Sequence, residues 1–202
     1  SIFELAFSGT DSRGINGIAY ILRGTSYGDV RILTGDSGAP DLMDIYGVGD
    51  VRGAANMVGT AQGYPTMLGK FPSMNGEDNV TLFRVEEMHL IAAETSLRAG
   101  NAADALSYLN NIPAIRGLGA DYYASATLEN ILEERRKEFA FEGLRFHDLS
   151  RMGMDMPSVD PFKQTNDDLT GTPPAYGSYR YAYPIALSER NANPNMVQNY
   201  GY

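Results

Sequence analysis

One short stretch of this sequence has the spacing of a nucleophilic active site. Residues 24–28 read Gly-Thr-Ser-Tyr-Gly, which places Ser26 in a Gly-x-Ser-x-Gly pattern. A nucleophile elbow of this type needs a strand before the serine and a helix directly after it. The apolar run at 18–22 predicts the strand, but residues 29–38 show no helical pattern. We therefore expect a glycine-rich loop, and a serine hydrolase using Ser26 is the least favoured function.

Residues that could bind a metal ion are sparse. The chain has no cysteine, and its two histidines, His89 and His147, are far apart and lack a second ligand at metal-binding spacing. The oxygen-rich stretch at 75–79 could hold calcium, but it lacks the spacing of an EF-hand and is more typical of a solvated turn. We expect no metal and no cofactor, and a hydrogen-bonded packing role for His89 within a helix.

Residues 133–136 read Glu-Glu-Arg-Arg and contain neighbouring carboxylates. Adjacent positions on a helix point about 100° apart, whereas the two carboxylates of a glycosidase must face each other across one sugar. We therefore expect no catalytic pair here and no enzyme activity. Glu133 and Lys137 are instead expected to form an ordinary surface ion pair one helical turn apart.

Arg135 differs from its neighbours because it falls on the apolar face of its predicted helix. A charged group is rarely buried unless it is paired. We therefore expect the guanidinium to be held by a carboxylate, from Glu94, Glu138 or Asp148.

The helices that must position these residues follow from apolar periodicity in the middle of the chain. Helices are predicted at 84–99, 102–112 and 128–142. Gly100, Pro113 and Gly143 are expected to end them in turn. Because only Gly100-Asn101 separates the first two, these helices must fold back as an antiparallel, tetratricopeptide-like pair.

The fold class expected from this pattern is mainly α, with long irregular loops and a few short strands. Residues 1–80 form a loop-rich segment suited to face a ligand, with short strands at 2–7 and 18–22. Residues 81–152 form the helical scaffold. Residues 153–202 are expected to be an extended loop followed by a packed end.

Composition excludes some partners. A net charge of −9 over 202 residues repels phosphate backbones, so a nucleic-acid partner is not expected. No run of about 18 apolar residues is present that would predict a transmembrane helix. The 13 tyrosines, 8 phenylalanines and absent tryptophan suit sugar recognition, because tyrosine offers a flat apolar face with a polar edge.

Three stretches together resemble the SusD/RagB family of nutrient-binding proteins. The most distinctive is 131–151, Ile-Leu-Glu-Glu-Arg-Arg-Lys-Glu-Phe-Ala-Phe-Glu-Gly-Leu-Arg-Phe-His-Asp-Leu-Ser-Arg. The second is 84–94, followed by Gly100 and the Ala-Leu-x-x-Leu-Asn of 105–110. The third is the C-terminal run from Tyr-Pro-Ile at 183–185 to residue 202. One departure is Phe146-His147, where the family usually has an aromatic pair.

The resemblance implies the C-terminal portion of a SusD-like domain. Such proteins are surface-exposed lipoproteins of the outer membrane in Bacteroidetes-type bacteria, held by a lipid anchor on an N-terminal part that precedes this region. They bind oligosaccharide and act as a lid on a SusC-like TonB-dependent transporter. The resemblance leaves open a second reading, a peptide- or protein-binding member of the same fold.

In this reading the ligand contacts fall in the irregular segments, where aromatic rings stack on sugar and polar groups hydrogen-bond to it. The aromatic candidates are Tyr27, Tyr46, Tyr64 and Phe71. The polar candidates are Asp29, Arg31, Asp50 and Asn56. Tyr176 and Tyr179 in the late loop form a second set, expected to face the transporter.

Overall fold

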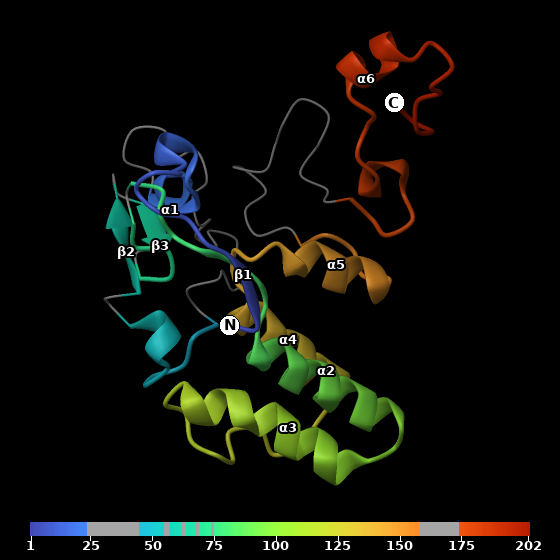
Figure 1. Ribbon diagram of the computed structural model, residues 1–202. Coiled ribbons are helices and arrows are strands. Elements are labelled where there is room, and N and C mark those ends of the chain that lie inside the picture. Colours follow the sequence, from blue (N-terminus) through green and yellow to red (C-terminus); the bar gives the residue numbers. More distant parts are fainter. Residues whose placement is uncertain (24–44, 55–56, 62–63, 68, 74, 158–173) are drawn as a thin grey trace.

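The computed structural model describes residues 1–23, 45–54, 57–61, 64–67, 69–73, 75–157 and 174–202 (Figure 1). This part of the chain is mainly helical with a few short strands, as predicted, and the strands pair into two small antiparallel sheets. The helices are α1 Ile18–Arg23, α2 Val85–Arg98, α3 Ala102–Ile115, α4 Leu128–Glu138, α5 Leu144–Arg151 and α6 Leu187–Ala192. The strands are β1 Phe3–Leu5, β2 Val58–Ala61, β3 Tyr64–Met67 and β4 Val80–Phe83.

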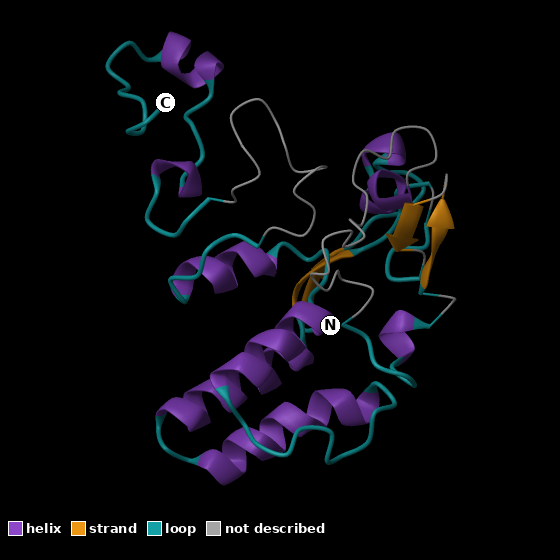
Figure 2. Ribbon diagram, turned by 180° about the vertical axis from the view of Figure 1, so that it is seen from behind, coloured by secondary structure: helices purple, strands orange, loops and turns teal. Residues whose placement is uncertain are grey.

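Helices α2 and α3 form the predicted antiparallel pair and lie side by side in both views (Figure 1, Figure 2). Gly100 adopts a φ of +80° between them, the left-handed conformation that ends α2. The buried faces meet through Leu90, Leu109 and Ile112, each fully buried. None of the described helices combines the length and apolar character needed to cross a lipid bilayer.

Helix α3 does not end at Pro113, so that expectation was wrong. Pro113 is inside the helix and its ring is fully buried. A proline removes one helical hydrogen bond, but the chain holds the next turn through Arg116, whose N–H donates to the carbonyl of Ile112 at 3.2 Å. The helix therefore continues to Ile115.

Helix α4 packs against both α2 and α3 and completes the main core. Thr127 caps its first turn by accepting a hydrogen bond from the Asn130 N–H at 3.1 Å, as expected for an N-cap. Ile131 and Phe139 join the same buried cluster as Leu90.

The C-terminal end of α4 lies at Glu138, earlier than predicted. Phe141 has a φ of +64°, which is uncommon for a residue with a side chain, and Gly143 has a φ of +80°. This bend directs Phe141 onto a second small core formed by Ala19, Leu22 and Phe71. Helix α5, which the periodicity did not predict, begins directly after it.

The first part of the chain is a loop-rich unit around the two sheets. Strand β1 pairs with β4 in the register Phe3↔Phe83, which confirms a strand within residues 2–7. The second predicted strand, at 18–22, is instead helix α1. Ala19 and Leu22, three positions apart, share a helical face that packs on the second core.

The C-terminal segment lies beyond α5 (Figure 1). Phe146 of α5 stacks on Tyr181 with ring centroids 5.5 Å apart and lies 5.9 Å from the ring of Tyr183. The Tyr181 hydroxyl also donates to the carbonyl of Met154 at 2.6 Å. These contacts connect residues 174–202 to the helical scaffold.

Candidate functional site

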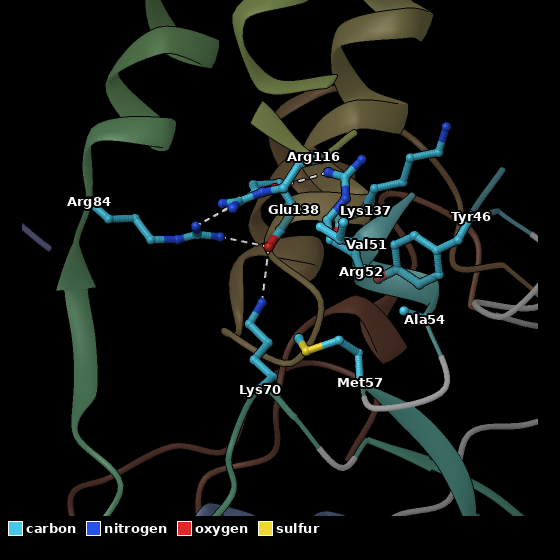
Figure 3. A pocket seen from close by; sticks show the side chains of 10 residues that line it. All are labelled: Tyr46, Val51, Arg52, Ala54, Met57, Lys70, Arg84, Arg116, Lys137 and Glu138. Carbon is cyan, nitrogen blue, oxygen red and sulfur yellow. Dashed lines mark hydrogen bonds and ion pairs between the residues drawn. The ribbon is translucent and has the colours of Figure 1, made fainter. Parts of the chain in front are cut away.

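A cavity of about 500 Å³ opens where the loop-rich part meets the C-terminal end of α4 (Figure 3). Its wall combines the ring of one tyrosine, three apolar side chains, five basic side chains and one carboxylate. The lining residues are Tyr46, Val51, Arg52, Ala54, Met57, Lys70, Arg84, Arg116, Lys137 and Glu138. They come from segments far apart in the sequence, so the cavity exists only in the folded chain.

Glu138 is the acidic centre of this wall. One of its carboxylate oxygens accepts from Arg84 at 2.5 Å and from Arg116 at 2.6 Å. The other accepts from Arg52 at 2.9 Å and from Arg116 at 3.0 Å. Figure 3 shows the side chains of Arg52, Arg84 and Arg116 gathered around Glu138. Three arginines therefore share Glu138 as a counter-charge at the end of α4.

Arg52 is held from the opposite side by a fork of charge-assisted hydrogen bonds. The Asp50 carboxylate accepts from its Nε at 2.9 Å and from its Nη2 at 2.8 Å, while Glu134 accepts at 2.7 Å. Burial alone would lower the pKa of Arg52, but the Asp50 hydrogen bonds and the Glu134 charge outweigh it and raise that pKa. Arg52 is therefore a permanently charged part of the wall.

Tyr46 provides the aromatic face of the cavity. Its hydroxyl donates to the carbonyl of Lys137 at 3.0 Å, and the guanidinium carbon of Arg52 lies 5.8 Å from the ring centroid. Burial raises the pKa of Tyr46 to about 12, and Asp50 and Glu138 add to this effect, although Arg52 opposes it. The phenol is therefore neutral and acts as a hydrogen-bonding ring rather than as a proton-transfer group.

Lys70 separates this cavity from a second one of about 370 Å³ that is also bordered by Phe71 and Phe141. Its ammonium donates to the carbonyl of Glu138 at 2.9 Å and pairs with Glu142 at 2.5 Å. Burial lowers the pKa of Lys70, and the charge of Glu142 only partly compensates.

The arrangement suits binding rather than catalysis. Glu134, Glu138 and Glu142 each accept from basic side chains, so none is placed as a free acid or base. What the wall offers a ligand is arginine and lysine hydrogen-bond donors beside the Tyr46 ring. Within the described residues no cluster of histidine, aspartate and glutamate could hold a metal ion.

Some predicted site residues fall on this cavity and others do not. Tyr46 lines it, and Asp50 lies beneath it with its carboxylate bound to Arg52. Phe71 is buried in the second core, 7% exposed, where its ring borders the neighbouring cavity. Tyr64 lies in β3.

The remaining predicted contacts are elsewhere. Tyr176 and Tyr179 are 52% and 44% exposed on the C-terminal segment, beyond α5 (Figure 1). Several predicted site residues lie outside the described residues, namely Tyr27, Asp29, Arg31 and Asn56. Ser26 lies outside them as well, but the element that precedes its segment is a helix, not the strand that a nucleophile elbow requires.

Arg135 has the carboxylate partner that its place on the apolar face predicts. Its Nε donates to Asp148 at 2.8 Å, so Asp148 is confirmed and the other two candidates are not its partners at this distance. The expected pair of Glu133 and Lys137 forms, but it is not the surface pair that was predicted, because Lys137 is buried. The ion pair is present at 2.5 Å, but Lys137 is only 2% exposed, and its ammonium lies 5.4 Å from the Tyr122 ring centroid and 5.9 Å from that of Tyr123.

Residues of both minor metal-site candidates make hydrogen bonds within the described part of the chain. His89 Nδ1 lies 3.3 Å from the Asn111 amide within the helix pair, as a hydrogen-bonded packing residue would. In the 75–79 stretch, Asp78 accepts from the backbone N–H of Ser73 and Asn79 accepts from that of Phe7, both at 3.0 Å. These oxygens are used to hold the turn.

The sequence did not point to Arg52, Lys70, Arg84 and Arg116 as cavity-lining residues. Arg84 carried one signal, because it starts the second family-like stretch, directly before α2. Arg52 and Arg116 reach Glu138 across 86 and 22 residues. Such pairing depends on tertiary structure, which spacing along the chain does not show.

The fold and the cavity define a class: a helical scaffold that presents a wall suited to ligand binding. Comparison with known proteins gives the family. Residues 62–202 match the model of the SusD family, and the chain belongs to this family.

Relatives and solved structures agree with this assignment. The chain is 32% identical over 126 residues to the starch-binding protein SusD of Bacteroides thetaiotaomicron, covering 62% of this chain and 22% of that protein. It is 27% identical over 142 residues to the SusD-like protein P25 of Formosa agariphila, covering 63% and 25%. A putative sugar-binding protein of Bacteroides vulgatus superposes with a TM-score of 0.76 at 29% identity, covering 100% of this chain and 46% of that one.

The chain therefore spans about a quarter of the curated relatives that it matches and about half of the solved structure. A SusD superfamily protein of Bacteroides thetaiotaomicron gives a similar result, with a TM-score of 0.74 at 28% identity over 98% of this chain.

Proposed function

We propose that this chain belongs to a protein that captures oligosaccharide without chemically changing it. The observation that carries the proposal is the composition of the cavity wall. The ring of Tyr46 lies there beside arginines that are held in place by ion pairs with Glu138. A ring and fixed donors suit a sugar's CH face and hydroxyl rim. Similarity to a starch-binding protein and to a putative sugar-binding protein supports the same class of ligand.

The finer parts of the proposal concern place and partner. We propose a surface-exposed lipoprotein of the outer membrane that delivers oligosaccharide to a SusC-like TonB-dependent transporter. Ligand contacts from the loop-rich part are expected to include Tyr27, Asp29, Arg31, Asn56 and Tyr64 together with Tyr46. Tyr176 and Tyr179, exposed on the C-terminal segment, are expected to face the transporter.

Calorimetric titration with neutral oligosaccharides and with peptides tests the proposal directly. The expected result is binding of at least one oligosaccharide and of none of the peptides. Tyr46→Ala should weaken that binding about tenfold or more, because a stacking ring contributes on the order of 1–3 kcal/mol of affinity. Tyr46→Phe keeps the ring and should retain most of the affinity.

Two results would overturn this assignment. Binding of peptides alone would favour the peptide-binding reading of the same fold. Unchanged sugar affinity in Tyr46→Ala would show that the cavity is not the site. Tyr200, which is 91% exposed on the C-terminal segment, offers a matched tyrosine-to-alanine control away from the cavity.

A further inference from the structure

Two arginines on successive helices border one cavity and have no carboxylate partner among the described residues. Arg136 of α4 and Arg145 of α5 line a cavity of about 470 Å³. Other arginines of the same helices are paired: Arg135 and Arg151 both donate to Asp148, at 2.8 and 2.9 Å. Arg135 and Arg151 are thus neutralised by a carboxylate, whereas Arg136 and Arg145 border the cavity without one in the described part of the chain.

The two charges also affect each other. Arg145 is only partly exposed, and burial, together with the charge of Arg136, lowers the pKa of Arg145 more than Asp148 raises it. Partly desolvated like charges are unfavourable unless an opposite charge accompanies them. An anion between the two guanidiniums would remove both costs.

The rest of the wall indicates what should carry that anion. Leu128, Leu132 and Met154 provide apolar surface, while Glu129 and Glu133 provide acceptors. Carboxylates would repel a second anion but accept hydrogen bonds from hydroxyl groups. A molecule with an acidic group at one end and hydroxyls on an otherwise apolar ring matches this distribution.

We propose that Arg136 and Arg145 bind the acidic group of an oligosaccharide, either a uronate carboxylate or a sulfate ester, whose hydroxyl groups face Glu129 and Glu133. Guanidinium groups bind such oxygens through paired, charge-assisted hydrogen bonds. The saccharide nature of the ligand rests on the proposed function. The inference that the ligand carries an acidic group depends on the arginine pair alone. This pair lies on α4 and α5 and does not line the cavity that contains Tyr46.

Titration calorimetry with three tetrasaccharides tests the site: a galacturonan, its neutral galactan counterpart and a sulfated galactan. The chain is expected to bind one or both acidic sugars more tightly than the neutral one. Arg136→Gln and Arg145→Gln should each weaken acidic binding about tenfold or more, the usual size of a hydrogen bond to a charged group. Neutral binding should not change. The preference should also decrease at high salt, because screening weakens attraction between partly exposed charges.

Arg190→Gln is the matched control, because Arg190 is an exposed arginine on α6, distant in sequence from the pair. It should leave all three affinities unchanged, and circular dichroism should show the same helical content in every variant. The two acidic ligands separate carboxylate from sulfate recognition.

Equal affinity for acidic and neutral sugars, or unchanged acidic binding in both arginine variants, would overturn the acidic site while oligosaccharide capture stands. Binding of no tetrasaccharide and no other oligosaccharide would overturn both.

Discussion

At the scale of single residues, Glu138 holds the charge network of the cavity together. Arg52, Arg84 and Arg116 all donate to its carboxylate, and Glu138 is only 3% exposed. Glu138→Gln keeps the shape but removes the shared counter-charge. We expect a loss of about 3–5 kcal/mol in unfolding free energy, the usual result of breaking a buried charge pair. Urea denaturation measures it, and Glu129→Gln, at an exposed position with no ion pair to another described residue, should cost less than about 0.5 kcal/mol.

The same carboxylate makes stability depend on pH. Burial alone would raise the pKa of Glu138, but the Arg116 hydrogen bond and the Arg84 charge outweigh it and lower that pKa to about 2 from an ordinary value of 4.5. Its contribution is therefore complete above pH 4.5 and is lost as the pH falls toward 2. Unfolding free energy should fall with acidification more steeply in the unaltered chain than in Glu138→Gln. Parallel pH profiles would contradict this account.

The need for a buried ion pair could be predicted from the sequence where the pattern of a single helix revealed it. Arg135 is a charge on an apolar face, so burial and helix geometry alone require a carboxylate partner, and Asp148 provides it. Nothing comparable marks Arg52, because its partners Glu134 and Glu138 lie 82 and 86 residues away. The difference between these two arginines is the difference between local and tertiary information.

At the scale of elements, periodicity predicted α2, α3 and α4 because each helix repeats its apolar face over several turns. It failed for α1, since six residues are too few to separate a helical repeat from a continuous apolar run. It also missed α5. That helix is only eight residues long. It follows a bend at Phe141, whose left-handed backbone conformation cannot be predicted from its residue type.

Two neighbours in α2 test how the helix pair is oriented. Leu90 is fully buried in the core shared with α3, whereas Ile91, about 100° further around the helix, is 43% exposed. Leu90→Ala should lower unfolding free energy by about 2–5 kcal/mol, because it removes apolar contacts and leaves a cavity. Ile91→Ala should cost less than about 1 kcal/mol. Chemical denaturation of both variants measures the difference, and similar losses would mean that α2 is rotated from the orientation described.

At the scale of the whole molecule, the chain combines a packed helical centre with two parts that attach to it differently. The loop-rich part is joined to α4 by ion pairs around Glu138 and by the fit of Phe141 into the second core. The C-terminal segment is joined to α5 mainly by aromatic rings and a few hydrogen bonds. The second attachment involves fewer buried groups, so we expect it to open more readily.

Phe146 is the residue on which that second attachment depends. Its ring stacks on Tyr181 and lies close to Tyr183, and each aromatic contact of this kind is worth about 0.5–1.5 kcal/mol. Phe146→Ala should therefore speed amide hydrogen exchange across residues 176–202 while leaving α2 and α3 unchanged. Mass spectrometry of exchange by segment provides this comparison within one sample.

His147 gives a control for this prediction on the same helix. It is exposed and meets Phe146 only edge-on, at a centroid distance of 5.8 Å, so His147→Ala should leave exchange in the C-terminal segment unchanged. If Phe146→Ala also has no effect, hydrogen bonds must hold the segment, from Tyr181 to Met154 and from Met156 to Pro174. Because the segment is held mainly by rings on α5, we expect it to detach without disturbing the charge network around Glu138, so that the cavity wall beside Tyr46 keeps its shape.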